Sequence, residues 1–272
     1  MSWHDELAHV AQGLELSRQA LAELDHEQLE VRDKPGGPVS EADLRVDAIL
    51  HEHLPRAGEA WLSEETEDDL ARLKHERLWI VDPIDGTKSY LAGRPEWCVS
   101  VGLVENGQPV VGGILNPSRD ELFLGAAGHG VTLNGEPVAC SERTELAGAS
   151  VLASRSERKR GEWDDARLRQ FSLRSVGSVA YKLALVAAGQ ADATFTLQPK
   201  NEWDVAGGAA LVEAAGGRIL DLTGAPLVLN DPVVRLSGLQ ASGSSLAPAL
   251  TSLVGELAPD RPVRMPGKRP SP

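Results

Sequence analysis

The sequence predicts a two-part α/β protein, and two patterns along the chain support this prediction. Residues 78–127 contain short apolar runs separated by turn residues, which is typical of an antiparallel or mixed sheet. From about residue 145, strand-like and helix-like runs alternate, which predicts a second α/β layer. A chain of 272 residues is long enough for one large domain or for two smaller ones that share an interface.

The N-terminal part begins with two predicted helices. Apolar residues recur on one helical face over residues 3–29, and a segment rich in proline and glycine follows. Ser40 has the character of an N-cap, and with Asp43 it resembles a capping box that opens a helix through Leu54. The apolar run 60–63 predicts a short strand.

The later elements follow from periodicity and turn residues. The polar segment 66–77 predicts a helix that leads into the apolar strand 78–81. Asn106-Gly107 and Asn134-Gly135 lie between strand-like runs and predict hairpin turns. The second half predicts a strand from 150, a helix over 178–192, a strand at 193–197, a helix over 204–217 and a strand at 218–224.

The composition disfavours several classes of function. A net charge of −13 and a pI near 5.0 disfavour binding to a nucleic-acid polymer or an anionic membrane, but allow a small anionic ligand that cations bring in. Cys98 and Cys140 form neither a disulfide framework nor a CxxC pair, which favours the reducing cytoplasm. The first residues lack the apolar region of a signal peptide, and no stretch is apolar enough to span a membrane.

A turn with two aspartates is the strongest chemical signal. Residues 82–87, DPIDGT, directly follow the apolar strand 78–81. Aspartate is common in turns, so the pair alone has an ordinary structural explanation. At the end of a strand, however, two uncompensated carboxylates repel each other, and a hard divalent cation such as magnesium would remove that cost. Gly86 would allow another group to approach the backbone closely.

Three more acidic residues are candidates, and each has an ordinary alternative. Glu64 begins an acidic run of the kind that usually forms a solvated face. Asp43 is also a plausible helix-cap acid, and Asp204 precedes a small-residue helix as an N-cap would. Their combination with the DPIDGT turn is what distinguishes them.

The motifs VSEAD, SEE, DPIDGT and WDVAGG occur in this order, and the series resembles the inositol monophosphatase superfamily of magnesium-dependent, lithium-sensitive phosphomonoesterases. The resemblance covers roughly residues 5–255. It implies a layered αβαβα sandwich of the inositol monophosphatase and fructose-1,6-bisphosphatase type. We expect an N-terminal α+β half at 1–145, a C-terminal α/β half at 146–258 and a flexible tail at 259–272.

The resemblance also implies a metal centre with two or three Mg²⁺ ions and inhibition by Li⁺. Glu64, Asp82 and the backbone carbonyl of Ile84 would hold one ion. Asp82, Asp85 and Asp204 would hold a second, and a third ion could share Glu64. Such ions can generate a hydroxide and neutralise phosphoryl oxygens, so no covalent nucleophile is required.

The remaining implied roles concern the attacking water and the substrate. Thr87, backed by Asp43, would orient the water and help to deprotonate it, and Glu64 would assist through its metal. The amides of Gly86 and Thr87 would meet the phosphate. The other residues assigned to the substrate are Lys88, Arg155, Gly177, Ser178 and Val179. Lys34 is a candidate for a mobile loop that closes over the site.

Two departures from the family pattern disfavour inositol as the substrate. Inositol monophosphatases usually place a glutamate a few residues before the WD motif to contact inositol hydroxyls, and this chain has Leu197 there. Their DGTTNF turn is also absent, because the chain continues as Lys88-Ser89-Tyr90. The predicted substrate is therefore a different small phosphorylated metabolite.

The closest motif match is to bacterial 3'(2'),5'-bisphosphate nucleotidases, which convert adenosine 3',5'-bisphosphate to AMP. The LSEE motif, Ser154-Arg155-Ser156 and Glu202-Trp203-Asp204 favour this group. The guanidinium of Arg155 suits a second phosphate, although the basic run after it is also compatible with a solvated loop. Inositol 1-phosphate, histidinol phosphate and fructose 1,6-bisphosphate remain alternative substrates.

A non-catalytic relative that binds a phosphorylated metabolite and regulates a partner is the alternative from another class. Such a relative would be expected to lack a metal carboxylate or the threonine, and this chain retains Glu64, Asp82, Asp85, Thr87 and Asp204. The enzyme is therefore favoured. A homodimer is common in the superfamily, but no feature of this sequence requires one.

Overall fold

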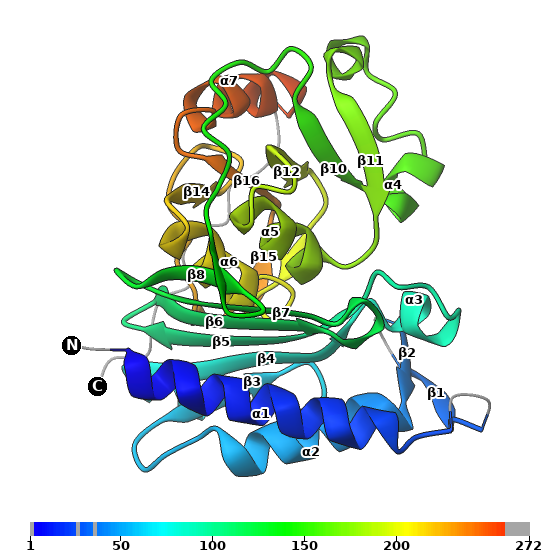
Figure 1. The fold of residues 1–272 in the computed structure, drawn as a ribbon, viewed down its shortest axis with the longest axis vertical. Helices are drawn as coiled ribbons and strands as arrows, with labels where there is room; N and C mark the ends of the chain where they lie inside the picture. Colours follow the sequence, from blue (N-terminus) through cyan, green and yellow to red (C-terminus); the bar gives the residue numbers. More distant parts are fainter. Residues whose placement is uncertain (1–2, 26–27, 35–36, 259–272) are drawn as a thin grey trace.

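The structure is a computed structural model that describes residues 3–25, 28–34 and 37–258. Two sheets alternate with three layers of helices, so the described chain forms an αβαβα sandwich (Figure 1). The predicted layered fold is confirmed. The tail predicted at 259–272 lies outside the described residues, and the division of the chain at 145 and 146 stays a prediction.

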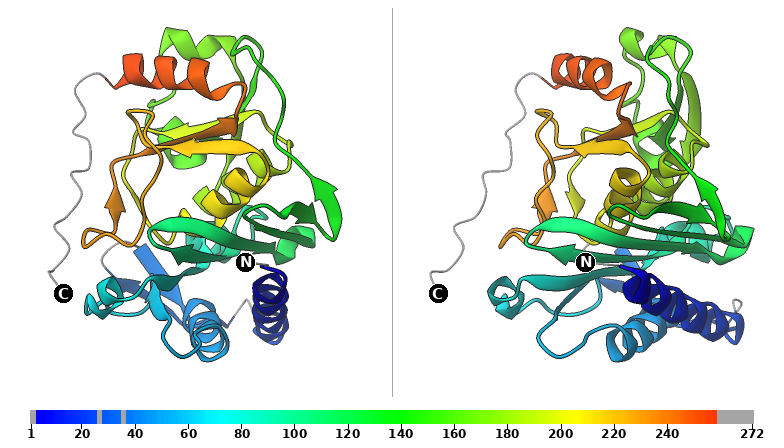
Figure 2. Two further views of the ribbon diagram at one scale, coloured as in Figure 1. Left: turned by 90° about the vertical axis from the view of Figure 1, so that its left-hand side faces the viewer. Right: turned by 60° about the vertical axis from the view of Figure 1, so that its left-hand side comes forward.

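Two long helices cover one face of the larger sheet (Figure 2). They are α1 (His4–Ala22) and α2 (Glu41–His53), joined through a hairpin of β1 (Val31–Lys34) and β2 (Gly37–Ser40). α2 begins at the predicted capping box, in which the backbone N–H of Ser40 donates to Asp43 Oδ2 at 2.8 Å.

The larger sheet has seven strands in the order β3-β4-β5-β6-β7-β8-β9, and only β3 and β4 run parallel within it. Its strands are β3 (Ala60–Ser63), β4 (Arg77–Asp85), β5 (Cys98–Glu105), β6 (Gln108–Asn116), β7 (Glu121–Ala126), β8 (Gly130–Leu133) and β9 (Glu136–Val138). The mixed sheet and both Asn-Gly turns are confirmed, since Asn106 and Asn134 have φ of 51° and 50°.

The second sheet has the order β11-β10-β12-β16-β14 and mixes parallel and antiparallel pairs. Its strands are β10 (Ser150–Ser154), β11 (Ser172–Val176), β12 (Ala193–Thr196), β14 (Gly217–Leu220) and β16 (Leu239–Gly243), and β13 (Lys200–Asn201) pairs separately with β15 (Arg235–Leu236). The remaining α-helices are α3 (Thr87–Leu91), α4 (Arg155–Lys159), α5 (Val179–Ala187), α6 (Ala206–Ala214) and α7 (Ala247–Leu257).

The helix predicted over 66–77 is wrong. Only a short 3₁₀ helix forms there, η1 (Ala71–Lys74), besides the 3₁₀ turns η2 (Pro117–Arg119) and η3 (Ala166–Gln170) elsewhere. The carboxylate of Asp68 accepts a hydrogen bond from the backbone N–H of Leu70 at 3.0 Å, and that of Asp69 accepts one from Ala71 at 2.8 Å. These local hydrogen bonds compete with those of a helix. The first helix also ends earlier than expected, at Ala22.

The central helices α5 and α6 lie between the sheets, and glycines allow α6 to pack directly on the larger one. A Cβ added to Gly112 on β6 would lie 2.3 Å from the carbonyl oxygen of Gly207 on α6. A Cβ on Gly207 would lie 2.7 Å from the carbonyl oxygen of Val101. This close approach brings the start of α6 to the middle of the sheet.

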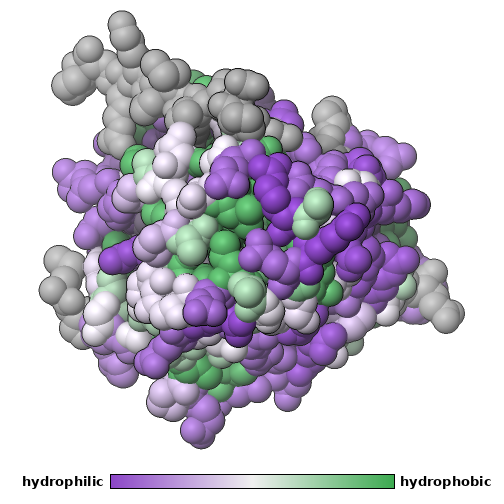
Figure 3. Space-filling model, turned by 90° about the horizontal axis from the view of Figure 1, so that it is seen from above, coloured by the Kyte–Doolittle hydropathy of each residue, from purple (hydrophilic) through white to green (hydrophobic). Residues whose placement is uncertain are grey.

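The outer side beyond the five-stranded sheet is mostly hydrophilic. Seen from that side, an apolar patch lies near the centre and hydrophilic residues surround it (Figure 3). α7 packs against β16 in this outer layer. Among the helices of the described residues, none is both long enough and apolar enough to cross a membrane.

Gly112→Ala is expected to lower the free energy of unfolding by about 1–3 kcal/mol, because the added methyl group must displace the backbone of α6. Gly255→Ala is the control, since its position in α7 is open, and it should raise stability by about 0.5–1 kcal/mol. Urea unfolding followed by circular dichroism measures both. A Gly112→Ala protein as stable as wild type would contradict the close packing.

Candidate active site

A β-bulge in β4 places both aspartates of the DPIDGT turn on the same face of the sheet. Asp82 pairs with Ser100 and Asp85 with Cys98, so three residues of β4 advance against two of β5. In a regular strand, residues three apart would point to opposite faces. The extra residue therefore turns Asp85 to the side of Asp82, which is the side that α5 and α6 cover.

Asp204 completes a group of three carboxylates. It lies two residues before α6, and one oxygen from each of Asp82, Asp85 and Asp204 falls within 4.8 Å of the others. Asp82 and Asp85 are buried, and Asp204 is partly buried. The group thus joins the end of a strand in the larger sheet to the start of a helix from the C-terminal half.

Backbone and hydroxyl donors hold one oxygen of each carboxylate. Asp85 Oδ2 accepts from the N–H of Ala180 at 2.6 Å and from the hydroxyl of Ser178 at 2.7 Å. Asp204 Oδ2 accepts from the N–H of Asn201 at 2.7 Å. Asp82 Oδ1 accepts from the N–H of Ile84 at 3.1 Å. These bonds orient the carboxylates but leave their charges close together.

The pKa values record the cost of this arrangement. Burial, and then the charge of Asp85, raise the pKa of Asp204 to about 7. Burial, and then the charges of Glu64 and Asp85, raise the pKa of Asp82 well above its usual range. Burial also raises the pKa of Asp85. A bound cation would oppose the rise in pKa, because it favours the ionised carboxylates.

The donors fit a hard divalent cation. Asp82 Oδ2 is buried and has no hydrogen-bond partner among the described residues, although a buried carboxylate oxygen normally has one. The group offers oxygen ligands only, which is the donor set that magnesium prefers. The acidic group could therefore bind a metal ion.

Glu64 lies near this group but pairs with a lysine. Its charge contributes to the raised pKa of Asp82, so it is an electrostatic neighbour. Lys34 Nζ lies 3.3 Å from Glu64 Oε1 and 2.7 Å from Glu65 Oε2. The β1–β2 hairpin thus contacts the site through Lys34, whose ammonium group pairs with both glutamates.

Asp43 and Thr87 are in contact, as the resemblance implied. The hydroxyl of Thr87 lies 3.2 Å from Asp43 Oδ1 and 3.1 Å from the carbonyl oxygen of Ile84. Asp43 Oδ2 accepts from the N–H and the hydroxyl of Ser40, so this buried carboxylate is used on both sides. Burial is the largest influence on the pKa of Asp43 and raises it.

The turn after Asp85 requires glycine. Gly86 has φ of 100°, and a Cβ there would lie 3.1 Å from the carbonyl oxygen of Glu96. Gly177 approaches the same carbonyl, since a Cβ added to Gly177 would lie 2.9 Å from the carbonyl oxygen of Glu96. Two of the predicted substrate residues therefore converge on the backbone of Glu96.

The other predicted substrate residues are distributed around this turn. Arg155 Nη2 lies 2.9 Å from Glu96 Oε1, and Arg155 Nη1 is buried without a hydrogen-bond partner among the described residues. Lys88 is exposed on α3, and Val179 begins α5. Ser178 contacts Asp85 itself, so the structure associates Ser178 with one of the three clustered carboxylates.

Sequence reasoning missed three features of the site. Ser178 adopts φ of 58°, which is uncommon outside glycine, and caps α5 while donating to Asp85. Glu96 pairs with Arg155, and Lys182 lies buried in the electrostatic field of Asp85 and Asp204. Glu96 and Lys182 interact with residues far along the chain, and no local motif predicts these interactions.

The fold and the site together are those of a layered α/β protein in which carboxylates between two sheets could bind a metal ion. A sequence model described as "Inositol monophosphatase family" matches residues 5–256, and the chain belongs to this family. Members of the family are phosphatases, and this chain is a phosphatase of the family.

Individual relatives agree with the family assignment. The chain is 37% identical over 199 residues to inositol monophosphatase 3 of Solanum lycopersicum, covering 68% of this chain and 74% of the relative. It is 42% identical over 158 residues to the Nus factor SuhB of Xylella fastidiosa, covering 56% and 57%. The crystal structure of the extragenic suppressor protein suhB from Bartonella henselae superposes with a TM-score of 0.77 at 28% identity, covering 92% and 98%.

The metal-free protein is expected to lose stability as pH rises from about 4 to 8. The pKa of Asp204 lies near 7 in the folded protein against 3.8 ordinarily, so the folded state keeps a proton that the unfolded state has released. Asp204→Asn should show a smaller loss, because asparagine does not ionise. Thermal unfolding in chelator at pH 5.5 and 8 measures the difference.

Added Mg²⁺ should raise the melting temperature of the wild type more at pH 8 than at pH 5.5, because the ligands must be deprotonated. If the melting temperatures of the wild type and of Asp204→Asn change equally with pH in chelator, the raised pKa of Asp204 is contradicted.

Proposed function

We propose that this protein is a magnesium-dependent phosphomonoesterase that hydrolyses a small phosphorylated metabolite with an activated water. One observation supports this proposal above the others. Oxygens of Asp82, Asp85 and Asp204 lie within 4.8 Å of one another, and Asp82 Oδ2 has no hydrogen-bond partner among the described residues. Such a group is costly without a cation and effective with one.

The proposed ligands come from both halves of the chain. Asp82, Glu64 and the carbonyl of Ile84 would hold one Mg²⁺, and Asp82, Asp85 and Asp204 a second; a third ion could share Glu64 after displacing Lys34. When bound, the ions would lower the pKa of a water and neutralise the phosphoryl oxygens.

The pair Thr87 and Asp43 would orient this water and receive its proton. The Thr87 hydroxyl lies 3.2 Å from Asp43 Oδ1, so when it donates to that carboxylate, the oxygen of Thr87 can accept a hydrogen bond from the water. Burial raises the pKa of Asp43, which makes its carboxylate a better base. The backbone of Gly86 and Thr87 would bind the phosphate, in the turn that lies against the backbone of Glu96.

For the substrate, we propose a phosphate ester with a second anionic group, such as adenosine 3',5'-bisphosphate. Leu197 packs in an apolar cluster with Trp163 and Phe195, so it supplies no ligand for sugar hydroxyls. Lys200 is partly exposed and its charge acts on Asp204. This charge favours a leaving group that is itself negative.

Inositol 1-phosphate is the second candidate, because a relative with 37% identity carries the name inositol monophosphatase. Histidinol phosphate, an alternative left open by the sequence, ranks lower. The relative named as a Nus factor raises the non-catalytic alternative, in which the protein binds a metabolite and regulates a partner. The intact contact between Thr87 and Asp43 favours catalysis over that alternative.

Asp85→Asn is expected to lower kcat/KM by roughly 10²-fold or more, because it removes charge from the second metal position. The protein should still fold, since the amide oxygen of asparagine can accept from Ser178 and Ala180 as the carboxylate does. Phosphate release at saturating Mg²⁺ measures the loss. Turnover equal to the wild type would refute the metal assignment.

Thr87→Val is expected to lower kcat by roughly 10²-fold with little change in KM, because the hydroxyl acts on the water and not on binding. Thr87→Ser retains the hydroxyl and is the matched control. Steady-state kinetics of both variants separate the two constants. A valine variant with wild-type kcat would exclude the proton path through Asp43.

The substrate is identified by kcat/KM over five phosphate esters: adenosine 3',5'-bisphosphate, inositol 1-phosphate, histidinol phosphate, fructose 1,6-bisphosphate and NADP. We expect adenosine 3',5'-bisphosphate to be preferred and Li⁺ to inhibit. A clear preference for inositol 1-phosphate would reverse the ranking.

A further inference from the structure

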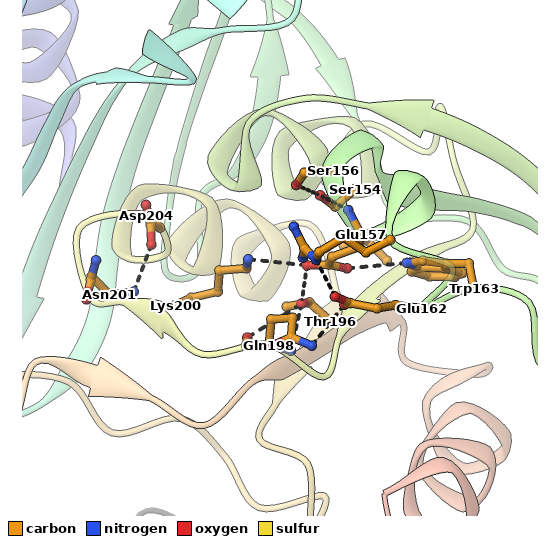
Figure 4. Close-up of polar contacts among 12 residues, drawn as sticks. Ser154, Ser156, Glu157, Glu162, Trp163, Thr196, Gln198, Lys200, Asn201 and Asp204 are labelled. Atoms are coloured by element: carbon orange, nitrogen blue, oxygen red, sulfur yellow. Dashed lines mark hydrogen bonds and ion pairs between the residues drawn. The ribbon is translucent and has the colours of Figure 1, made fainter. Parts of the chain in front are cut away.

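A buried glutamate outside the metal group is the centre of a second polar network (Figure 4). Glu157 on α4 is 2% exposed and has three hydrogen-bond donors around it. The hydroxyl of Thr196 donates to its Oε1 at 2.7 Å, and the indole N–H of Trp163 donates to its Oε2 at 3.3 Å. Lys200 Nζ also donates to Oε1 at 3.3 Å. A carboxylate is buried at a cost unless it is paired in this way.

One lysine pairs with this carboxylate, and a second lies in its electrostatic field. Lys200 forms the ion pair with Glu157, while Lys182 on α5 is 4% exposed and lies in the field of the same glutamate. The lysines also act on the metal group, since Lys200 favours the ionised form of Asp204 and Lys182 that of Asp85. Glu157 therefore fixes positive charge beside the proposed ligands.

The network continues through the backbone to Asp204. Thr196 donates to Glu157 and accepts the N–H of Gln198, which defines the turn after β12. Lys200 follows this turn, and the next residue, Asn201, donates its N–H to Asp204 Oδ2 at 2.7 Å. The strand β13 that contains both residues has only two residues and pairs with β15, and the next residue, Glu202, donates its N–H to the carbonyl oxygen of Val234 at 2.8 Å. Lys200 adds a side-chain anchor at the start of this segment.

We infer that Glu157 is a positioning residue for the metal ligand Asp204. Its carboxylate anchors Lys200, Lys200 fixes Asn201, and the N–H of Asn201 sets the orientation of the Asp204 carboxylate. Figure 4 shows these side chains in one row from Trp163 to Asp204. The inference rests on the proposed role of Asp204 in metal binding.

The test compares Mg²⁺ binding by Glu157→Gln and the wild type, measured by calorimetry without substrate and by the Mg²⁺ dependence of phosphate release. Glutamine keeps the size of the side chain but not the charge that anchors Lys200. We expect about a tenfold higher Kd for Mg²⁺ and a matching rise in the half-activating concentration, with KM for the substrate unchanged. Thermal unfolding confirms that the variant is folded.

Asp165→Asn is the matched control. Asp165 lies in the same segment, but its carboxylate bonds to the backbone and guanidinium of Arg167, away from Lys200. It should leave Mg²⁺ binding unchanged. A Glu157→Gln protein with a lower melting temperature but wild-type Mg²⁺ binding would show a structural role only and would overturn the inference.

Lys200→Met tests the same path from the other partner and replaces the first variant if that one does not fold. It should raise the Kd about tenfold, and the double variant should lose no more than either single one. Additive losses would mean that Glu157 acts by another route. Asp204→Asn separates the proposals: wild-type Mg²⁺ binding there refutes the ligand assignment, whereas a loss there without one in Glu157→Gln refutes only the positioning role.

Discussion

The repulsion among three buried carboxylates is the constraint on which the site depends. Asp82, Asp85 and Asp204 would move apart if the fold did not hold them together, and their burial side by side favours protonation. One oxygen of Asp85 accepts a hydrogen bond from the start of α5, and one oxygen of Asp204 accepts from the turn before α6, so backbone groups of the fold orient both carboxylates. The glycine contacts that allow α6 to pack closely on the sheet also hold the carboxylates together, because they set how close Asp204 comes to β4.

Several side chains serve the fold and the site together. Asp43 caps α2 through Ser40 and contacts Thr87 with its other oxygen. Ser178 caps α5 and donates to Asp85. Helix starts are suited to this use, because their unpaired N–H groups stabilise carboxylates while the helix fixes the position of the cap. The chemistry is thereby placed where the main elements begin.

The sequence predicted those parts of the molecule that depend on local signals. The strand before DPIDGT, both Asn-Gly turns, the capping box at Ser40 and the layered fold all follow from residues close in the chain or from a series of motifs. The segment 66–77 misled, because side-chain bonds from Asp68 and Asp69 outcompete helix formation. Contacts such as Arg155 with Glu96 join distant segments, and neither partner carries a sign of the other.

The bulge between Asp82 and Asp85 decides which face of the sheet the second carboxylate meets. The two aspartates are three positions apart, and only the extra residue of the bulge keeps them on one face. A change of length that left the bulge in place would turn one carboxylate to the opposite face, whereas a deletion that removed the bulge would leave both carboxylates on the same face of a regular strand. Whether two ligands survive a change of length at this turn therefore depends on the backbone irregularity and not on the number of residues alone.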